Sequence, residues 1–132
     1  MPPSYRDANE IHVGRGHIDL ACEAFHPVTA CGKADVLFYA LPAGEAMKSA
    51  GALLAAGKRV IDLGADFRLK DPERYRTWYK EEPAPPELLA QSVYGVPELH
   101  RARVREARLV ANPGCYPISS LLGFAPLLAH RR

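Results

Sequence analysis

The sequence contains no long run of apolar residues. No stretch approaches the roughly 20 apolar residues that a membrane-spanning helix needs. The N-terminal segment Met1–Asp7 also lacks the apolar core of a signal peptide. These two absences predict a cytoplasmic protein with no contact to a membrane.

Cysteine is scarce, and its spacing excludes two common uses of the residue. The chain has three cysteines, Cys22, Cys31 and Cys115, and no pair has the spacing of a CxxC motif. An odd number without such a pair argues against a disulfide framework and against a zinc site. We therefore expect three thiols in a reducing compartment and no bound metal.

An excess of charge of one sign is also missing. The chain has 17 Lys and Arg residues and 15 Asp and Glu residues, so its net charge is +2. A balance this close to zero gives no support for nucleic acid as a partner. The length of 132 residues and the hydrophobic fraction of 48% fit one soluble domain.

Residues 1–33 show no sustained period of 2 or 3.6 residues and are interpreted as a poorly defined N-terminal segment. Gly14-Arg15-Gly16 is the candidate for a dinucleotide-binding fingerprint in this part of the chain. A third glycine is missing, no clear strand precedes the pair and no helix is predicted after it. The sequence therefore favours a loop over a phosphate-binding turn.

From Ala34 onward the pattern becomes regular. The apolar run Val36–Leu41 predicts a strand buried on both faces, which is typical of a parallel sheet. Good helix formers with one apolar face follow over Glu45–Ala56, and Arg59–Leu63 predicts a second strand. Strand, helix and strand with tight connections indicate a right-handed parallel crossover. The fold class is therefore α/β, with a partial doubly wound (Rossmann-like) parallel sheet.

The rest of the chain continues this alternation. We expect a helix over 71–79 capped by an aspartate, a rigid connector over 82–86, an extended segment over 93–98, a basic helix face over 101–108, a third strand over 109–111 and an apolar helix over 115–129. Pro126 predicts a kink in the last helix. Because ligands bind at the carboxyl ends of parallel strands, the loops at Pro42 and Asp66 lie on the functional edge.

Cys115 lies at a strand-to-helix junction, directly after a Pro-Gly turn. The unpaired N–H groups and the positive dipole end of a first helical turn favour a thiolate over a thiol. The same N–H groups can stabilise an oxyanion, Asn112 can add a donor, and Gly114 allows close approach of a substrate. A small buried hydrophobic residue is the competing interpretation. The sequence places no histidine beside Cys115.

Four segments, in this order, resemble the N-acetyl-gamma-glutamyl-phosphate reductases. They are 34–44, 60–69, 93–99 and the motif Ala-Asn-Pro-Gly-Cys-Tyr-Pro at 111–117. The resemblance implies that residues 34–111 are part of a dinucleotide-binding domain. It implies further that residues 112–132 are the nucleophile loop and first helix of the catalytic domain.

The resemblance also implies an activity and a set of site residues. The family reduces N-acetyl-gamma-glutamyl phosphate to the semialdehyde with NADPH, in arginine biosynthesis, through a thioester on the cysteine equivalent to Cys115. Its members are homo-oligomers, and the partner is a small acyl phosphate. The implied residues are Leu41, Pro42 and Gly44 for the cofactor, and Arg68, Asn112 and Gly114 for the substrate or its oxyanion.

Two features of the family have no counterpart in this sequence. They are the glycine-rich turn that holds the cofactor pyrophosphate and the catalytic histidine, which lies downstream of the cysteine motif. We therefore expect the isolated chain to lack reductase activity. Two alternatives stay open: a non-catalytic remnant or assembly piece, and a relative of aminoadipyl-phosphate reductase or aspartate-semialdehyde dehydrogenase.

Overall fold

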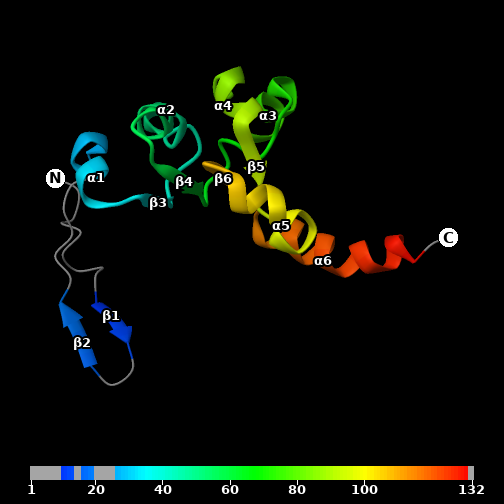
Figure 1. Cartoon of the computed structure of the whole chain (residues 1–132). Coiled ribbons are helices and arrows are strands. Elements are labelled where there is room, and N and C mark those ends of the chain that lie inside the picture. The colour runs from blue at the N-terminus through cyan, green and yellow to red at the C-terminus, as the bar shows by residue number, and fades with distance from the viewer. Residues whose placement is uncertain (1–9, 14–15, 20–25, 131–132) are drawn as a thin grey trace.

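The computed structural model describes residues 10–13, 16–19 and 26–130 of the chain (Figure 1). These residues form a two-stranded and a four-stranded sheet together with helices. The four-stranded sheet has the order β3-β4-β6-β5, and every neighbouring pair in it is parallel. The α/β class predicted from the sequence is confirmed.

The strand-helix-strand unit predicted after Ala34 is also confirmed. Strand β3 (Val36–Tyr39) is followed by α2 (Met47–Ala55) and then by β4 (Arg59–Asp62). Strands β3 and β4 pair in parallel, with Val36 opposite Arg59. Strand β6 (Leu109–Ala111) pairs with the other side of β4 and completes the centre of the sheet.

The N-terminal part of the chain is more regular than the sequence indicated. Strands β1 (Glu10–Val13) and β2 (Gly16–Asp19) form an antiparallel hairpin, and α1 (Pro27–Lys33) is a short helix. Gly14 and Arg15, part of the fingerprint candidate, lie outside the described residues. Residues 10–19 contain no continuous apolar run like that of Val36–Leu41, which is why the sequence did not indicate these strands.

The described residues cover the four-stranded sheet unequally: β6 is buried at all three of its residues, whereas β3 is buried on one face only. The core cluster holds Leu37 and Tyr39 of β3, Val60 of β4, and the buried side of α2. On the opposite face, Val36 is 43% exposed and Phe38 is 66% exposed. The prediction that this strand is buried on both faces is wrong. The apolar run makes both faces suitable for burial, but a second covering layer must come from other elements.

Between β4 and β6 the chain forms two helices and an edge strand. Helix α3 (Pro72–Tyr79) has the predicted cap, because Asp71 Oδ1 accepts hydrogen bonds from the N–H groups of Glu73 at 2.9 Å and Arg74 at 3.4 Å. Helix α4 (Pro86–Gln91) was not predicted and begins at the last proline of the expected connector. A proline at the first helical position needs no N–H partner, so it starts this helix rather than preventing it.

An edge strand and a further helix, β5 and α5, follow α4. Strand β5 (Ser92–Tyr94) pairs with β6, and α5 (Pro97–Glu106) carries the exposed side chains of Arg101, Arg103 and Arg105. Arg108 lies beyond this helix, and its guanidinium donates to the carbonyl of Leu54 at 2.5 Å.

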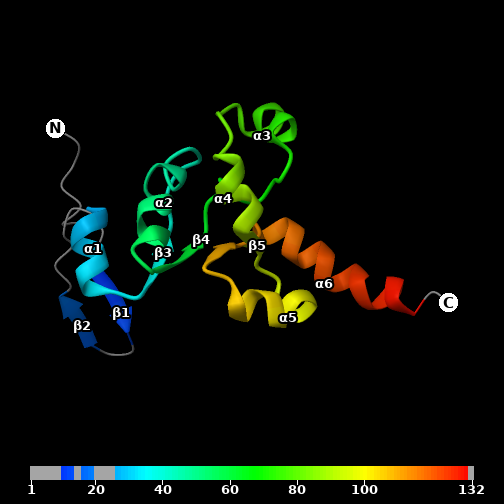
Figure 2. The same cartoon turned by 45° about the horizontal axis from the view of Figure 1, so that its top comes forward.

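Helix α6 (Cys115–Ala129) extends away from the sheet (Figure 2). Its predicted bounds are confirmed, with Pro126 inside the helix.

Candidate active site

Three loops meet at the carboxyl ends of β3, β4 and β6. Gly64, after β4, lies so close to the loop after β3 that a Cβ on it would be 3.0 Å from the carbonyl oxygen of Leu41. The N–H of Asn112, after β6, donates to the carbonyl of Asp62 at 2.8 Å. The edge that the sequence predicts to be functional is therefore a continuous surface.

Arg68 joins the loop after β4 to the cysteine motif. Its Nε donates to the carbonyl of Asn112 and its Nη2 to the carbonyl of Leu63, each at 2.8 Å. Its Nη1 would be 3.3 Å from a Cβ on Gly114 and has no hydrogen-bond partner among the described residues. Arg68, Asn112 and Gly114, assigned to one site from the sequence, thus lie together.

Cys115 is the first residue of α6, and its side chain is exposed. Gly114 occupies the N-cap position and supplies no side-chain cap. Within the described part of the chain, the backbone N–H groups of Cys115 and Tyr116 have no partner, and Pro117 has no N–H. Two donors next to an exposed thiol suit an oxyanion that forms on a bound acyl group.

The side chain of Asn112 is half-buried, and its amide nitrogen donates to a carbonyl of the neighbouring residue. Its Nδ2 donates to the carbonyl of Pro113 at 3.2 Å. This bond is long, so a stronger acceptor such as an oxyanion could replace it. The role of Asn112 as an oxyanion donor stays a prediction.

Gly44 is held by Asp66, a residue whose contacts the sequence did not reveal. Gly44 has a φ of +86°, and its N–H donates to Asp66 Oδ1 at 2.7 Å. The other oxygen of Asp66 accepts the N–H of Met47, at the start of α2, at 2.9 Å, and the Tyr75 hydroxyl donates to Oδ1 at 3.1 Å. Ala46 offers no side-chain cap, so Asp66 supplies the cap of α2 from a distant loop.

The exposure and the hydrogen bonds of the loop after β3 decide which parts of a dinucleotide it could hold. Leu41 is half-buried and Pro42 is exposed at the sheet edge, so both offer surface to a ligand that passes the strand ends. The Gly44 amide is committed to Asp66, so it cannot also bind a cofactor phosphate. The residues present fit a cofactor that packs against Leu41 and Pro42. They do not form a phosphate cradle at Gly44.

Asp62 is a second buried carboxylate that the sequence did not single out. Its Oδ1 accepts the N–H of Gly64 at 2.9 Å, while Oδ2 has no partner within the described residues. Burial, with a further contribution from the nearby Asp66, raises the pKa of Asp62 to about 6, and Arg68 partly opposes the shift. The feature of the sequence that could have indicated a buried Asp62 is a charged residue at the end of an otherwise apolar strand.

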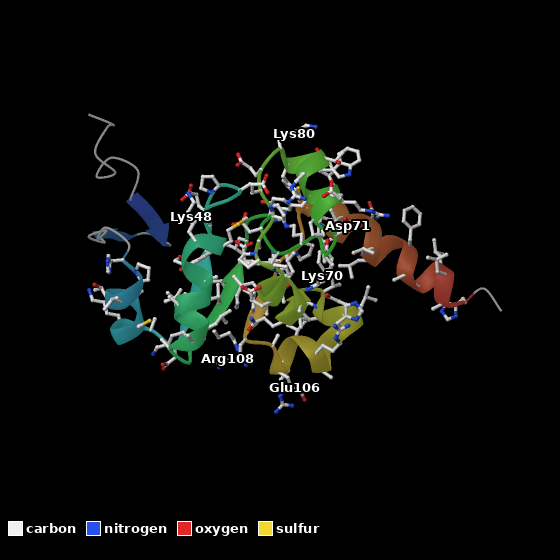
Figure 3. The ribbon with its side chains drawn as sticks, turned by 90° about the horizontal axis from the view of Figure 1, so that it is seen from above. Lys48, Lys70, Asp71, Lys80, Glu106 and Arg108 are labelled. Carbon is white, nitrogen blue, oxygen red and sulfur yellow. The ribbon has the colours of Figure 1, made fainter. Side chains whose placement is uncertain are left out.

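Lys70, labelled in Figure 3, connects the loop that carries Arg68 to the end of α4 and the start of β5. Its ammonium donates to the carbonyl oxygens of Leu89 and Ser92 and to the Ser92 hydroxyl. Partial burial of this group lowers the pKa of Lys70. The lysine therefore fixes the loop that carries Arg68, although it lies outside the predicted site.

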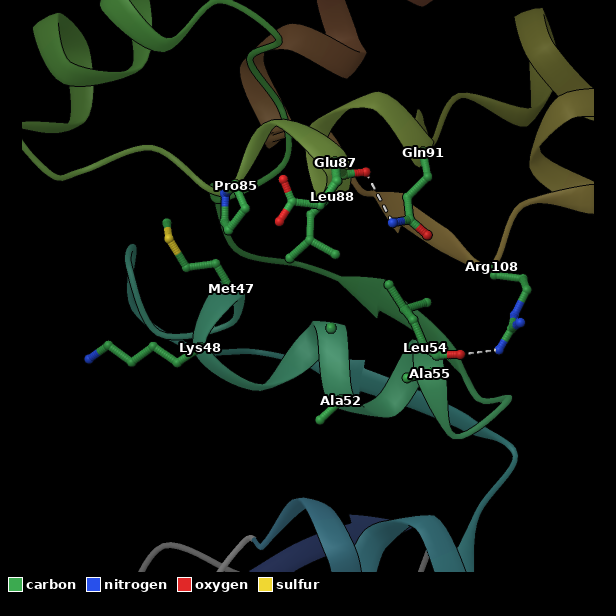
Figure 4. Close-up of a pocket in the computed structure, with 11 residues that line it drawn as sticks. Met47, Lys48, Ala52, Leu54, Ala55, Pro85, Glu87, Leu88, Gln91 and Arg108 are labelled. Carbon is green, nitrogen blue, oxygen red and sulfur yellow. Dashed lines mark hydrogen bonds between the residues drawn. The ribbon is translucent and has the colours of Figure 1, made fainter.

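A groove of about 530 Å³ lies elsewhere, between α2 and α4 (Figure 4). Met47, Ala55, Leu88 and Arg108 are among the residues that line it, and neither Cys115 nor Arg68 does. The groove is therefore separate from the site at the strand ends.

The described ranges contain neither a cluster of metal-ligating side chains nor a helix that could span a membrane. Residues 26–130 and the hairpin contain no group of three His, Cys, Asp or Glu side chains that could hold a metal ion. None of the helices in these ranges is long and apolar enough to cross a membrane. Cys31 is half-buried, and Cys22 lies outside the described residues.

Three similar proteins are named N-acetyl-gamma-glutamyl-phosphate reductase. The relative from Azotobacter vinelandii is 53% identical over 114 residues, which cover 86% of this chain and 33% of the relative. That from Acidithiobacillus ferrooxidans is 53% identical over 115 residues, covering 87% and 33%. That from Nitrosococcus oceani is 50% identical over 117 residues, covering 89% and 34%.

The chain thus spans about a third of the length of the curated relatives it matches. A family model described as semialdehyde dehydrogenase, NAD binding domain, matches residues 4–107. This match covers most of the chain, including the parallel strands β3 and β4 and the loops that carry Gly44 and Arg68. The chain belongs to the semialdehyde dehydrogenase NAD-binding domain family.

Proposed function

We propose that this chain carries the nucleophile and part of the cofactor surface of an NADPH-dependent reductase that acts on N-acetyl-gamma-glutamyl phosphate. The observation that carries the proposal is the exposed Cys115 at the start of α6, with Arg68 against the preceding glycine. The printed names of the relatives support the choice of substrate. The pathway is then arginine biosynthesis, and the compartment is the cytoplasm.

Residues 34–111 form part of the dinucleotide-binding domain in this proposal, and residues 112–132 begin the catalytic domain. The Cys115 thiolate attacks the acyl carbon of the substrate. The carbon–oxygen bond to the phosphate breaks, and inorganic phosphate leaves with the bonding electron pair. The N–H groups of Cys115 and Tyr116 stabilise the negative charge on the carbonyl oxygen. Arg68 Nη1 compensates the charge of the departing phosphate.

The chemistry that NADPH supplies when bound is a hydride for the acyl carbon of the thioester. Leu41 and Pro42 would hold the cofactor at the strand ends. Cys115 would be the leaving group, as a thiolate that takes the electron pair of the broken carbon–sulfur bond, and the aldehyde would be the product. Homo-oligomers are expected for the longer members of the family, since the sequence resemblance implies them.

The first half of this reaction can be tested without any cofactor. The purified chain is incubated with acetyl phosphate as an acyl-phosphate probe, and intact-protein mass spectrometry with peptide mapping locates the adduct. We expect an acetyl group on Cys115 that neutral hydroxylamine removes, as a thioester requires, together with release of inorganic phosphate. Alkylation by iodoacetamide near neutral pH should likewise modify Cys115 before Cys31 or Cys22.

Cys115→Ser is the matched control, because the exposed position tolerates the change without loss of packing. The variant should lose the hydroxylamine-labile adduct. Arg68→Met should slow acylation by acetyl phosphate more than alkylation by the neutral reagent, because only the first reaction releases a charged phosphate. Equal modification of all three thiols in a folded sample would contradict the proposal and favour a non-catalytic remnant of the fold.

A further inference from the structure

Gly95 lies where the turn after β5 meets the backbone that leads into the cysteine motif. It is buried, and its N–H donates to the carbonyl of Ala111 at 2.9 Å. A Cβ on Gly95 would lie 2.8 Å from Val110 Cγ1 and 3.3 Å from the Ala111 oxygen. The Cα of Asn112 would be 3.5 Å away. Because Cβ atoms in proteins do not come within 3.0 Å of a neighbour, only glycine allows this close approach.

The backbone at Asn112 is held from the other side by the loop after β4. Strand β6 lies between β4 and β5 in the sheet. The N–H of Asn112 donates to the carbonyl of Asp62, and the carbonyl of Asn112 accepts a bond from Arg68 Nε, both at 2.8 Å. Together with the bond from Gly95 to Ala111, these contacts fix the backbone just before the nucleophile from both neighbouring strands.

The cysteine motif has little room to move away from the turn after β5. Arg68 Nη1 would lie 3.3 Å from a Cβ on Gly114, which is closer than ordinary van der Waals contact. Pro113 joins Asn112 to Gly114, and its φ is fixed by the ring, so a displacement of Asn112 is passed on to the start of α6. The valine beside the turn is stiff and cannot rotate freely out of the way. A side chain in the turn would therefore move the thiol relative to the guanidinium.

We propose that Gly95 is a positioning residue for Cys115, because its missing side chain lets the turn after β5 and Arg68 hold the nucleophile loop between them. The role rests on the proposed function, in which the Cys115 thiolate attacks an acyl phosphate. That attack needs the sulfur and the anion-stabilising donors in one arrangement, and a shift of about 1 Å can lower a rate by roughly 100-fold. Gly95 acts through the backbone of Asn112 and does not contact the reacting atoms.

Amide hydrogen exchange in Gly95→Ala tests the positioning without any reaction. The N–H of Asn112, bonded to Asp62, reports the nucleophile loop, and the N–H of Val60, bonded to the Arg108 carbonyl at 2.8 Å, reports the sheet. We expect the ratio of the Asn112 rate to the Val60 rate to rise at least about tenfold, because the loop opens locally. A merely structural role would speed both amides together through global unfolding and leave the ratio unchanged.

Acylation of Cys115 by acetyl phosphate is the second measurement. In Gly95→Ala the acylation rate, divided by the rate of alkylation with iodoacetamide, should fall about tenfold, because only acylation needs the anion-stabilising donors in place. If the parent chain is not acylated, the proposed function fails. The exchange ratio still decides in that case whether Gly95 positions the loop.

Val110→Ala is the rescue variant, because it removes the methyl carbon nearest to the added Cβ. The double variant Gly95→Ala with Val110→Ala should fold even if the single variant does not. It should also return both ratios to the values of Val110→Ala alone. Gly51→Ala is the matched control, since a Cβ there would meet the Leu88 methyl carbons at ordinary distances of 3.9 and 4.0 Å. It should leave both ratios at the parent values.

Circular dichroism establishes which variants are folded. An exchange ratio in folded Gly95→Ala that equals the parent ratio would overturn the proposal. The same conclusion would follow from a double variant that stays unfolded or keeps the raised exchange ratio, because relief of the contact with Val110 would then have restored nothing.

Discussion

At the scale of single residues, the site edge contains two buried carboxylates in opposite situations. Asp66 accepts hydrogen bonds at both oxygens from Gly44, Met47 and Tyr75. Asp62 uses one oxygen for Gly64 and leaves the other without a partner in the described structure. A buried charge that lacks partners is costly, and this cost is the physical cause of the raised pKa of Asp62.

We predict that Asp62 makes the chain less stable as the pH rises. Its pKa is about 6 in the folded chain against 3.8 for the unperturbed group, so the folded state binds the proton more tightly. The stabilisation is complete below the unfolded pKa and is lost as the pH rises through about 6. Asp62→Asn should remove this part of the pH dependence, up to about 3 kcal/mol between pH 4 and 7.5. Urea unfolding across that range measures it.

Asp35→Asn provides a control of opposite sign. Asp35 is exposed and paired with Lys58, whose ammonium lowers the pKa of this carboxyl group. The stabilisation from this pair is present above the unfolded pKa and is lost as the pH falls. A pH profile for Asp62→Asn that matches the parent profile would show that Asp62 is not the group responsible.

At the scale of elements, α2 depends on a residue that belongs to another loop. Asp66 caps the start of α2 and fixes the Gly44 turn, whereas α3 is capped by its own neighbour Asp71. A local cap can be read from the sequence, because Asp followed by Pro is a helix start. A distant cap cannot, because nothing in the residues around Ala46 indicates which loop will supply the acceptor.

We therefore predict unequal costs for removing the two caps. Asp66→Ala leaves three donors without an acceptor in a largely buried place and should lower the free energy of unfolding by about 3 kcal/mol or more. Asp71→Ala removes an exposed cap and should cost about 1 kcal/mol. Chemical denaturation of both variants measures the difference. Equal costs would mean that water replaces Asp66 at the start of α2.

The sequence pattern predicted some of the remaining helices and strands and missed others. Strands β4 and β6, helices α2, α3 and α6, and the parallel direction of the strands follow from apolar runs, helix formers and proline positions. Helix α4 was missed because six residues are too few to establish a helical period, and the N-terminal hairpin was missed because its strands contain no continuous apolar run.

At the scale of the whole molecule, the described sheet is buried on both faces at β6 but open on one face at β3, and α6 extends away from it. The chain spans about a third of its relatives. The sequence resemblance assigns the catalytic histidine and the pyrophosphate turn to segments that this sequence does not match. We accordingly predict no NADPH-dependent reductase turnover by the purified chain, even where acetyl phosphate acylates Cys115.

The assay follows NADPH absorbance with the acyl phosphate substrate, and a full-length relative serves as the positive control. Turnover by the 132-residue chain, lost in Cys115→Ser, would contradict this prediction. It would show that the site at the strand ends is complete in residues of this chain.

The sequence alone determined the α/β class, the position of Cys115 at a helix start and the resemblance to a reductase family. These are local properties, since apolar period, capping and motif are written within a few neighbouring residues. Tertiary structure decided that Arg68 lies against Gly114, that Asp66 occupies the Gly44 amide and that Asp62 is buried with an unpartnered oxygen. Such contacts join loops that are distant in sequence, and they form only when parallel strands bring their carboxyl ends to one edge.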